Sequence, residues 1–298
     1  MTSAILTDGL GKKFRRVNAL NDLNLNVPEG ALFAMVGPNG AGKTTLIKLL
    51  MNIVDPTAGH AEVLGIDSRR IRGAFFAAIG YVSENQEIPA WMRVGEFLAY
   101  LRPFYPTWDR SLEWELSRQF ELPLDRKLSD LSRGVRMKAV LAGSLAYRPK
   151  LIVLDEPFTG LDPLVRDQFI EGLLKRAGET TIFVSSHDLG EIESFASHIG
   201  YLEEGHLRFS EELRALSGRF RQVELAFDAP PSVPAKIPGT WMQLSVSETF
   251  VRLVESRFDV ERTNHEIREL FGAAPRVSYT PMSLRSIFLA IAKSSDEG

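Results

Sequence analysis

The sequence of 298 residues contains no cysteine, which excludes disulfide bonds, thiolate metal sites and thiol catalysis. Long hydrophobic runs are also missing, since the most apolar stretches, LIVLD and SIFLAIA, are far shorter than the roughly 18 residues of a membrane helix. Neither sign of charge dominates: 35 basic and 38 acidic residues leave a net charge of -3, without the basic footprint of a nucleic-acid binder. The opening MTSAILTDGL has no signal-peptide pattern, so we expect a soluble, cytoplasmic chain.

A glycine-rich segment, GPNGAGKTT, follows the apolar run ALFAMV at residues 31–36 and precedes LIKLLMNI, whose apolar spacing is helical. This order of strand, loop and helix is typical of a P-loop, G-x-x-x-x-G-K-[ST], and disfavours the alternative of a glycine-rich turn that matches by chance. Glycines let backbone N–H groups surround a phosphate, and the helix N-terminus adds positive charge. We expect Lys43 to reach the β- and γ-phosphates and the Thr44 hydroxyl to ligate Mg²⁺. The nucleotide contacts expected from this loop are Gly37, Asn39, Gly40, Ala41, Gly42, Lys43, Thr44 and Thr45.

A second phosphate-site signal is LIVLDE at residues 151–156, in which four apolar residues predict a central parallel strand and two acids end it. Open α/β sheets place their ligands at the carboxyl ends of such strands. We therefore expect Asp155 to hold Mg²⁺ through water and Glu156 to orient and polarise the attacking water. The alternative, two acids that merely cap the next helix, loses weight beside a P-loop.

Further segments, taken with these two, carry a family resemblance. LSRGVRMK resembles the signature sequence LSGGQ of ATP-binding-cassette (ABC) proteins, VSSH resembles their switch histidine, and GLD at residues 160–162 resembles their D-loop. With the P-loop, LIVLDE and Phe14, these motifs stand in the family's order across residues 4 to about 210. The sequence thus resembles the nucleotide-binding subunit of an ABC transporter. The resemblance implies an α/β fold, a P-loop NTPase cassette with a mixed sheet core and an inserted helical subdomain.

The resemblance also implies a site that one chain cannot complete. In this family two cassettes pack head to tail, so Ser132 and Gly134 are expected to bind the γ-phosphate of the partner's ATP, and Asp162 to lie beside the nucleotide. His187 is expected to contact the γ-phosphate and Phe14 to stack on adenine. For each, a plainer alternative remains: LSRG is also a capped helix start, a lone histidine is often structural, and Phe14 fits a strand end.

Glu84 occupies a position where the family usually has a glutamine, the Q-loop residue, which touches Mg²⁺ and the attacking water. A carboxylate is a stronger Mg²⁺ ligand than an amide, but it adds negative charge beside Asp155 and Glu156. We expect Glu84 to be the third metal-site residue. Gln86, two residues on, is the alternative and would need a bulge or a tighter turn.

The cassette is expected to occupy residues 1–215, with a helical subdomain at about 94–147. Residues 216–298 predict a small C-terminal α+β domain of strands and two helices, with Gly272 ending the first helix and Ser283 capping the second. The role of this domain is either dimer contact or regulation, and the sequence does not distinguish the two. Near the joint of the helical subdomain lie Trp91, Phe104, Tyr105 and Trp108, which fit either core packing or a groove for a membrane subunit.

The leading hypothesis is an ATPase that uses ATP and Mg²⁺, forms a homodimer and drives a separate membrane permease, and is peripheral on the inner face of the cell membrane. The sequence around FYPTWD and LSRG resembles that of bacterial ABC-2-type export systems. One alternative is a soluble ABC ATPase acting as a mechanical clamp on nucleic acid or ribosomes, although one cassette without a coiled coil or basic arm disfavours it, and we expect no nucleic-acid partner. Glu156 argues against a third reading, an ATP sensor with little hydrolysis.

Overall fold

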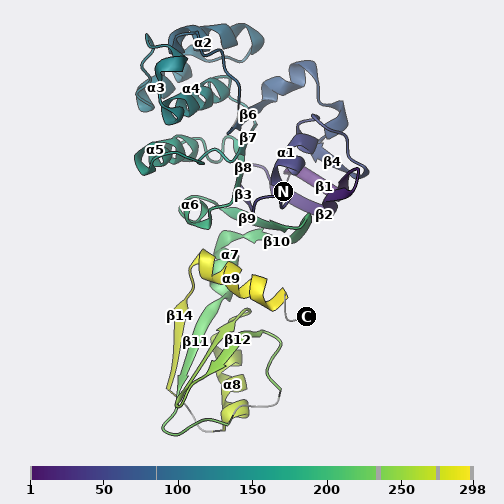
Figure 1. Cartoon of the computed structure of the whole chain (residues 1–298), viewed down its shortest axis with the longest axis vertical. Coiled ribbons are helices and arrows are strands. Elements are labelled where there is room, and N and C mark those ends of the chain that lie inside the picture. Colours follow the sequence, from purple (N-terminus) through teal and green to yellow (C-terminus); the bar gives the residue numbers. More distant parts are fainter. Residues whose placement is uncertain (1, 85, 233–235, 273–275, 296–298) are drawn as a thin grey trace. The chain divides into compact units, whose positions relative to one another are not determined.

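A computed structural model describes residues 2–84, 86–232, 236–272 and 276–295 of the chain (Figure 1). These residues form two compact units, 1–210 and 211–298, each of which is described by itself. The sequence places the end of the cassette at residue 215, whereas the compact units divide between Ser210 and Glu211. No helix in the described ranges combines the length and the apolar content that a membrane span requires.

The first unit is built on a six-stranded sheet in the order β10-β9-β3-β8-β7-β6. Its central strands are buried along their whole length, as expected for parallel strands that are covered on both faces. The strands predicted at 31–36 and within LIVLDE are confirmed as β3 and β7. The bounds are β3 (Leu32–Val36), β6 (Ile79–Ser83), β7 (Leu151–Asp155), β8 (Thr181–Ser186), β9 (His198–Glu203) and β10 (His206–Glu212).

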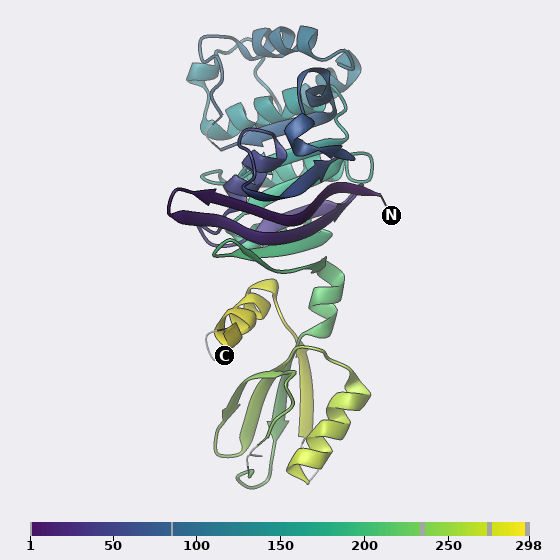
Figure 2. The same cartoon turned by 90° about the vertical axis from the view of Figure 1, so that its right-hand side faces the viewer.

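A second, antiparallel sheet in the order β2-β1-β4-β5 was not predicted. Its long β1–β2 hairpin is plain in Figure 2. Irregular register, with shifts between Ser3 and Ile5 and between Thr7 and Leu10, breaks the alternation that predicts strands. Side chains of both sheets and of helix α1 (Lys43–Leu50) share one hydrophobic core. The strands are β1 (Ser3–Phe14), β2 (Val17–Pro28), β4 (Ala58–Val63) and β5 (Ile66–Asp67).

The helical subdomain predicted at about 94–147 is present as α2 (Val94–Leu101), α3 (Arg110–Gln119) and α4 (Arg133–Leu145). These helices group beside edge strand β6 in Figure 1. The predicted apolar face of α3 is confirmed, since Leu112 and Leu116 are buried and Phe120 is buried directly after the helix. The Asp109 side chain starts α3 by accepting hydrogen bonds from two backbone N–H groups.

The aromatic residues near this subdomain divide between the two interpretations. The Tyr105 ring stacks on Tyr147 at 3.8 Å between centroids, and Trp108 donates to Glu113 from its indole N–H, so these two are packed. Trp91 and Phe104 are 70% and 61% exposed, so core packing is wrong for them.

The first unit contains further helical segments in its described part. They are α5 (Pro163–Leu174), α6 (Leu189–Glu193) and the 3₁₀ turns Ser68–Arg70, Gly73–Ala78, Arg102–Phe104 and Leu128–Asp130.

The second unit is the predicted α+β arrangement, an antiparallel sheet in the order β12-β13-β11-β14. Alternate residues of β11 and β13, including Val223 and Leu253, form a core with Ile267 of helix α8. Gly272 follows α8 with a φ of +65°, which confirms it as the stop residue. The elements are α7 (Leu213–Arg219), β11 (Arg221–Ala226), β12 (Trp241–Val246), β13 (Phe250–Glu255), α8 (Val260–Phe271), β14 (Arg276–Pro281) and α9 (Leu284–Ser295).

Candidate active site

The P-loop lies between β3 and α1, and the backbone at two of its positions requires glycine. A Cβ at Gly37 would lie 2.0 Å from the carbonyl oxygen of Leu202 on β9, so no side chain fits there. Gly42 has a φ of +111°, a conformation that side chains disfavour, and α1 begins at the next residue. Lys43 is only 6% exposed, and its Nζ donates to the carbonyl oxygens of Gly37 at 2.7 Å and Pro38 at 3.2 Å. The lysine therefore lies along its own loop.

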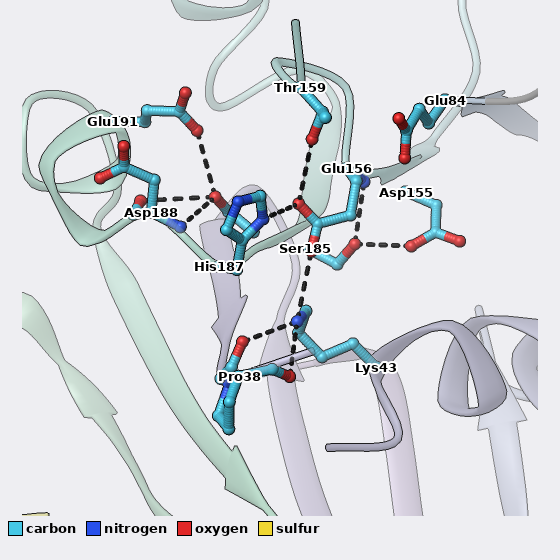
Figure 3. Close-up of polar contacts among 12 residues, drawn as sticks. Pro38, Lys43, Glu84, Asp155, Glu156, Thr159, Ser185, His187, Asp188 and Glu191 are labelled. Carbon is cyan, nitrogen blue, oxygen red and sulfur yellow. Dashed lines mark hydrogen bonds and ion pairs between the residues drawn. The ribbon is translucent and has the colours of Figure 1, made fainter. Parts of the chain in front are cut away.

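Asp155 is the buried acid at the end of β7, and two hydroxyl groups converge on it, of which Figure 3 draws that of Ser185. Thr44 Oγ1 donates to Asp155 Oδ1 at 3.2 Å, and Ser185 Oγ donates to the same oxygen at 2.7 Å. The pairing of Asp155 with Ser185 follows directly from the parallel register of β7 and β8. Sequence reasoning missed Ser185, although its place in VSSH, two residues before the expected switch histidine, was the available signal.

The Glu156 carboxylate holds two expected site residues together. Its Oε1 lies 3.2 Å from Lys43 Nζ, and its Oε2 lies 2.8 Å from His187 Nδ1 (Figure 3). Thr159 Oγ1 approaches the same Oε2 at 3.5 Å. The Glu156 backbone has a φ of +50°, held in place by the bond that its N–H donates to Ser185 Oγ at 3.0 Å. Because Glu156 engages Nδ1 of His187, Nε2 is the ring nitrogen that remains to meet a phosphate.

Helix α6 follows the histidine and carries a carboxyl group with a perturbed proton affinity. Burial raises the pKa of Glu191, and the hydrogen bond that Ser186 Oγ donates at 3.2 Å only partly offsets this effect. Asp188 accepts a hydrogen bond from the Gly190 N–H and so starts the helix. The Glu191 side chain is thus mostly buried and is bonded to Ser186, the residue before His187.

The oxygen atoms of Thr44 and Asp155 suit a magnesium ion. Mg²⁺ prefers hard oxygen ligands, keeps several waters, and takes only one or two protein groups beside substrate phosphates. In the described part of the chain, no group of three or more His, Asp or Glu side chains forms a self-sufficient metal cage. The pair of oxygens 3.2 Å apart therefore fits a metal shared with a nucleotide, and it does not fit a metal held by protein alone.

The expected signature residues lie at the start of α4. Ser132 caps the helix by accepting from the Val135 N–H at 3.4 Å, so the alternative of a capped helix start is confirmed as its local role. Gly134 packs against α5, where a Cβ would lie 2.8 Å from Val165 Cγ1. Asp162 caps α5 by accepting from the Val165 N–H at 3.0 Å. Phosphate binding by these residues stays a prediction.

Phe14 lies at the tip of the β1–β2 hairpin and is 43% exposed. Lys12 Nζ is 4.8 Å from the centre of its ring. The start of β2 reaches the P-loop, because a Cβ at Gly42 would lie 2.5 Å from the carbonyl oxygen of Ala19. The hairpin is therefore anchored at the nucleotide loop, while stacking of Phe14 on adenine stays a prediction.

Glu84 follows β6 directly, and its N–H donates to the carbonyl oxygen of Asp155 at 3.0 Å. Its carboxylate pairs with Arg133 Nη2 at 3.0 Å. Gln86 turns back on β6, where its side-chain oxygen accepts from the Ser83 N–H at 3.3 Å and its backbone N–H donates to the Ser83 carbonyl at 3.2 Å. Glu84 is thus the residue beside the acid strand, but its metal role stays a prediction.

Comparison with known proteins places this site in a family. The family model described as ABC transporter matches residues 20–159. The bacitracin transport ATP-binding protein BcrA of Enterococcus faecalis is 31% identical over 97% of this chain and 96% of the relative. The ABC transporter ATP-binding protein YtrB of Bacillus subtilis is 28% identical over 94% of this chain and 95% of the relative. Both alignments are long enough to include most of the C-terminal unit.

The fold agrees with solved cassettes. The dimeric structure of MJ0796, a bacterial ABC transporter cassette, superposes with a TM-score of 0.63 at 25% identity and covers 70% of this chain and 99% of that chain. The motif order, the strand-end carboxylates, the fold and the near full-length match to BcrA agree. The chain belongs to the family of ABC transporter ATP-binding proteins.

Proposed function

We propose that this ATPase hydrolyses Mg²⁺-bound ATP between two copies packed head to tail, and that the cycle drives a separate membrane permease in export. The observation that carries the proposal is the convergence of Lys43, Glu156 and His187 on one side of the Thr44–Asp155 pair. A cation for phosphate, a carboxylate for water and a histidine donor are the groups that phosphoryl transfer to water requires.

The contacts of Glu156 suggest how this chain's residues work. A γ-phosphate entering the P-loop competes for Lys43, which releases the Glu156 carboxylate from its ion pair. Glu156 then accepts a hydrogen bond from the attacking water, while His187 presents Nε2 to the phosphate. Mg²⁺ held by Thr44 and, through water, Asp155 would neutralise the phosphate charge.

We propose a second copy because the signature residues make only structural contacts in the described part of their own chain. Within its own chain, Ser132 caps the start of α4 and Gly134 packs against Val165 of α5. The positive start of α4, a helix of 13 residues, suits the γ-phosphate of another copy. The solved MJ0796 cassette is described as dimeric, which supports this arrangement.

A groove between the helical subdomain and β6 supports the permease proposal. It has a volume of about 470 Å³ and is lined by side chains of α2, α4 and the segment after β6. Tyr100, half exposed at 51%, and Phe97 lie on its α2 wall. An apolar, aromatic groove of this size suits an amphipathic helix of a partner. The names of BcrA, a bacitracin transport protein, and of the probable multidrug protein YbhF of Escherichia coli favour export.

The proposal is tested by purifying the tagged chain from detergent-extracted membranes of its own host. We expect one co-purified protein with several membrane helices, which stimulates or restrains ATP hydrolysis when reconstituted in vesicles. Recovery of ribosomes or DNA instead, in amounts matching the chain, would favour the clamp alternative. A tagged chain with Lys43→Ala controls for nucleotide-dependent capture, because it lacks the cation expected at the phosphates.

A further inference from the structure

Arg133 stands where the family signature LSGGQ has its first glycine, and its guanidinium joins three segments of the chain. It is the first residue of α4, directly after the capping Ser132. Its Nη2 lies 3.0 Å from Glu84 Oε1. On another side, a Cβ at Gly160 would lie 3.1 Å from Arg133 Nη1, so the guanidinium rests on the glycine of the loop before α5. The segment after β6, the start of α4 and this loop therefore meet at one cation.

The other end of the pair is tied to the metal-site strand. The Glu84 N–H bonds to the carbonyl oxygen of Asp155, which places the glutamate beside the acid that contacts Thr44. A third carboxylate next to Asp155 and Glu156 raises the local negative charge, and its repulsion needs a counter-ion in the absence of metal. Each acid that flanks Asp155 has one: Lys43 at 3.2 Å from Glu156, and Arg133 at 3.0 Å from Glu84.

The ion pairs Lys43–Glu156 and Arg133–Glu84 differ in burial, and the more exposed pair is easier to break. Lys43 and Glu156 are 6% and 15% exposed, whereas Arg133 and Glu84 are 37% and 31% exposed. Solvent weakens an ion pair of the second kind, so a divalent cation competes for its carboxylate at small cost. The backbone of Glu84 stays beside the site when its side chain leaves Arg133, because its N–H is bonded to the carbonyl oxygen of Asp155.

We propose that Arg133 is a positioning residue that holds the Glu84 carboxylate in the nucleotide-free chain and yields it to the metal when ATP and Mg²⁺ bind. The inference rests on the proposed Mg²⁺-dependent ATP site. Because Arg133 belongs to α4 and Glu84 to the end of β6, exchange of this pair links metal binding to the contact between the helical subdomain and the catalytic sheet. Glutamate at position 84 and arginine at position 133 are then matched departures from the family's glutamine and glycine.

The test measures Mn²⁺, a spectroscopically visible substitute for Mg²⁺, binding to the full chain saturated with a non-hydrolysable imido analogue of ATP. Removing the competing cation in Arg133→Gln is expected to tighten Mn²⁺ binding about two- to fivefold, the range of a partly exposed ion pair. Arg133→Lys keeps the charge and is expected to stay near the parent. Arg136→Gln removes the same charge one turn along α4, where Arg136 makes no ion pair with the residues that the structure describes, and is expected to change the affinity less than twofold.

The Glu84→Gln background separates the effect of the Arg133–Glu84 ion pair from the effect of removing a positive charge near the metal site. There the Arg133→Gln change is expected to have no further effect on Mn²⁺ affinity, because the carboxylate through which it acts is gone. An equal effect in both backgrounds, or an effect of Arg136→Gln as large as that of Arg133→Gln, overturns the proposal. Failure of the proposed ATPase function has a different signature, since the parent chain would then not bind the analogue at all.

Discussion

Glu156 carries contacts that the proposed mechanism requires ATP to rearrange, which makes it the most informative single residue of the site. Its carboxylate bridges Lys43 and His187 at 3.2 and 2.8 Å. These contacts give the buried lysine a counter-ion, and in the proposed mechanism the same carboxylate becomes available to water once nucleotide binds.

Glu156→Gln is expected to lower the rate of ATP hydrolysis by about 10²–10⁴-fold, the usual value of a positioned general base. ATP binding is expected to be retained or tightened, because the variant lacks the carboxylate that competes with the phosphate for Lys43. Phosphate release and equilibrium nucleotide binding measure the two effects. Glu171→Gln, at a site on α5 that is 61% exposed, is the control and should change neither. An unchanged hydrolysis rate in the Glu156 variant would reject its assigned role.

Glu191 supplies a pH-dependent prediction. Burial raises its pKa above the ordinary value of 4.5, so the folded chain holds this proton more tightly than the unfolded chain. The stabilising contribution is therefore present below pH 4.5 and is lost as the pH rises through the raised pKa. Glu191→Gln lacks this loss, so its melting temperature relative to the parent is expected to increase from pH 4 upward. Glu193→Gln on the same helix is exposed and serves as the control. A difference that is constant with pH contradicts the prediction.

At the scale of elements, the nucleotide loop depends on how closely β3 and β9 approach. The Leu202 carbonyl of β9 occupies the space that a side chain at Gly37 would need. Gly40, by contrast, has a φ of +83° and open space around its absent Cβ. The same loop thus contains one glycine required by contact and one required by backbone conformation.

Gly37→Ala is expected to destabilise the chain by about 3 kcal/mol, near the upper end of overpacking costs, because backbone cannot turn aside as a side chain can. Gly40→Ala is expected to cost about 1 kcal/mol, from its left-handed conformation alone. Urea unfolding compares the two. Equal losses would mean that the close approach of Leu202 does not restrict the loop.

At the scale of the whole molecule, the groove beside β6 is the surface that we propose for the permease. Its α2 wall carries Tyr100, whereas the similarly exposed Trp114 on α3 lies outside it. These two aromatic residues therefore separate the effect of the groove from the effect of an exposed aromatic in general.

Tyr100→Asp is expected to weaken permease binding about 30-fold, which corresponds to a loss of about 2 kcal/mol from an aromatic anchor. Trp114→Asp is expected to leave binding unchanged, and both variants should hydrolyse ATP as isolated chains. Co-purification from membranes at matched expression measures the effect. Equal recovery of the permease by both variants would place the contact elsewhere.

Local sequence patterns were sufficient to predict an element wherever the pattern lies within one continuous segment. The P-loop spacing, the buried strands β3 and β7 and the helix stop at Gly272 were all predicted, because apolar periodicity and glycine conformation are encoded in neighbouring residues. The same holds for the four strands and for helices α8 and α9 of the second unit, whereas α7 was not predicted.

Tertiary structure alone decided which side chains meet. Ser185 joins Asp155 only because β7 and β8 pair in register, and Glu84 meets Arg133 only because β6 ends where α4 begins. The sheet of β1, β2, β4 and β5 was not predicted for a related reason: bulges break the alternation of β1, and its second partner, β4, lies beyond the P-loop and α1 in the sequence. The residues themselves therefore identified the chemistry of an ATP site, while strand register and helix placement determined which acid has which counter-ion, since contact depends on distance in space and local sequence encodes only distance along the chain.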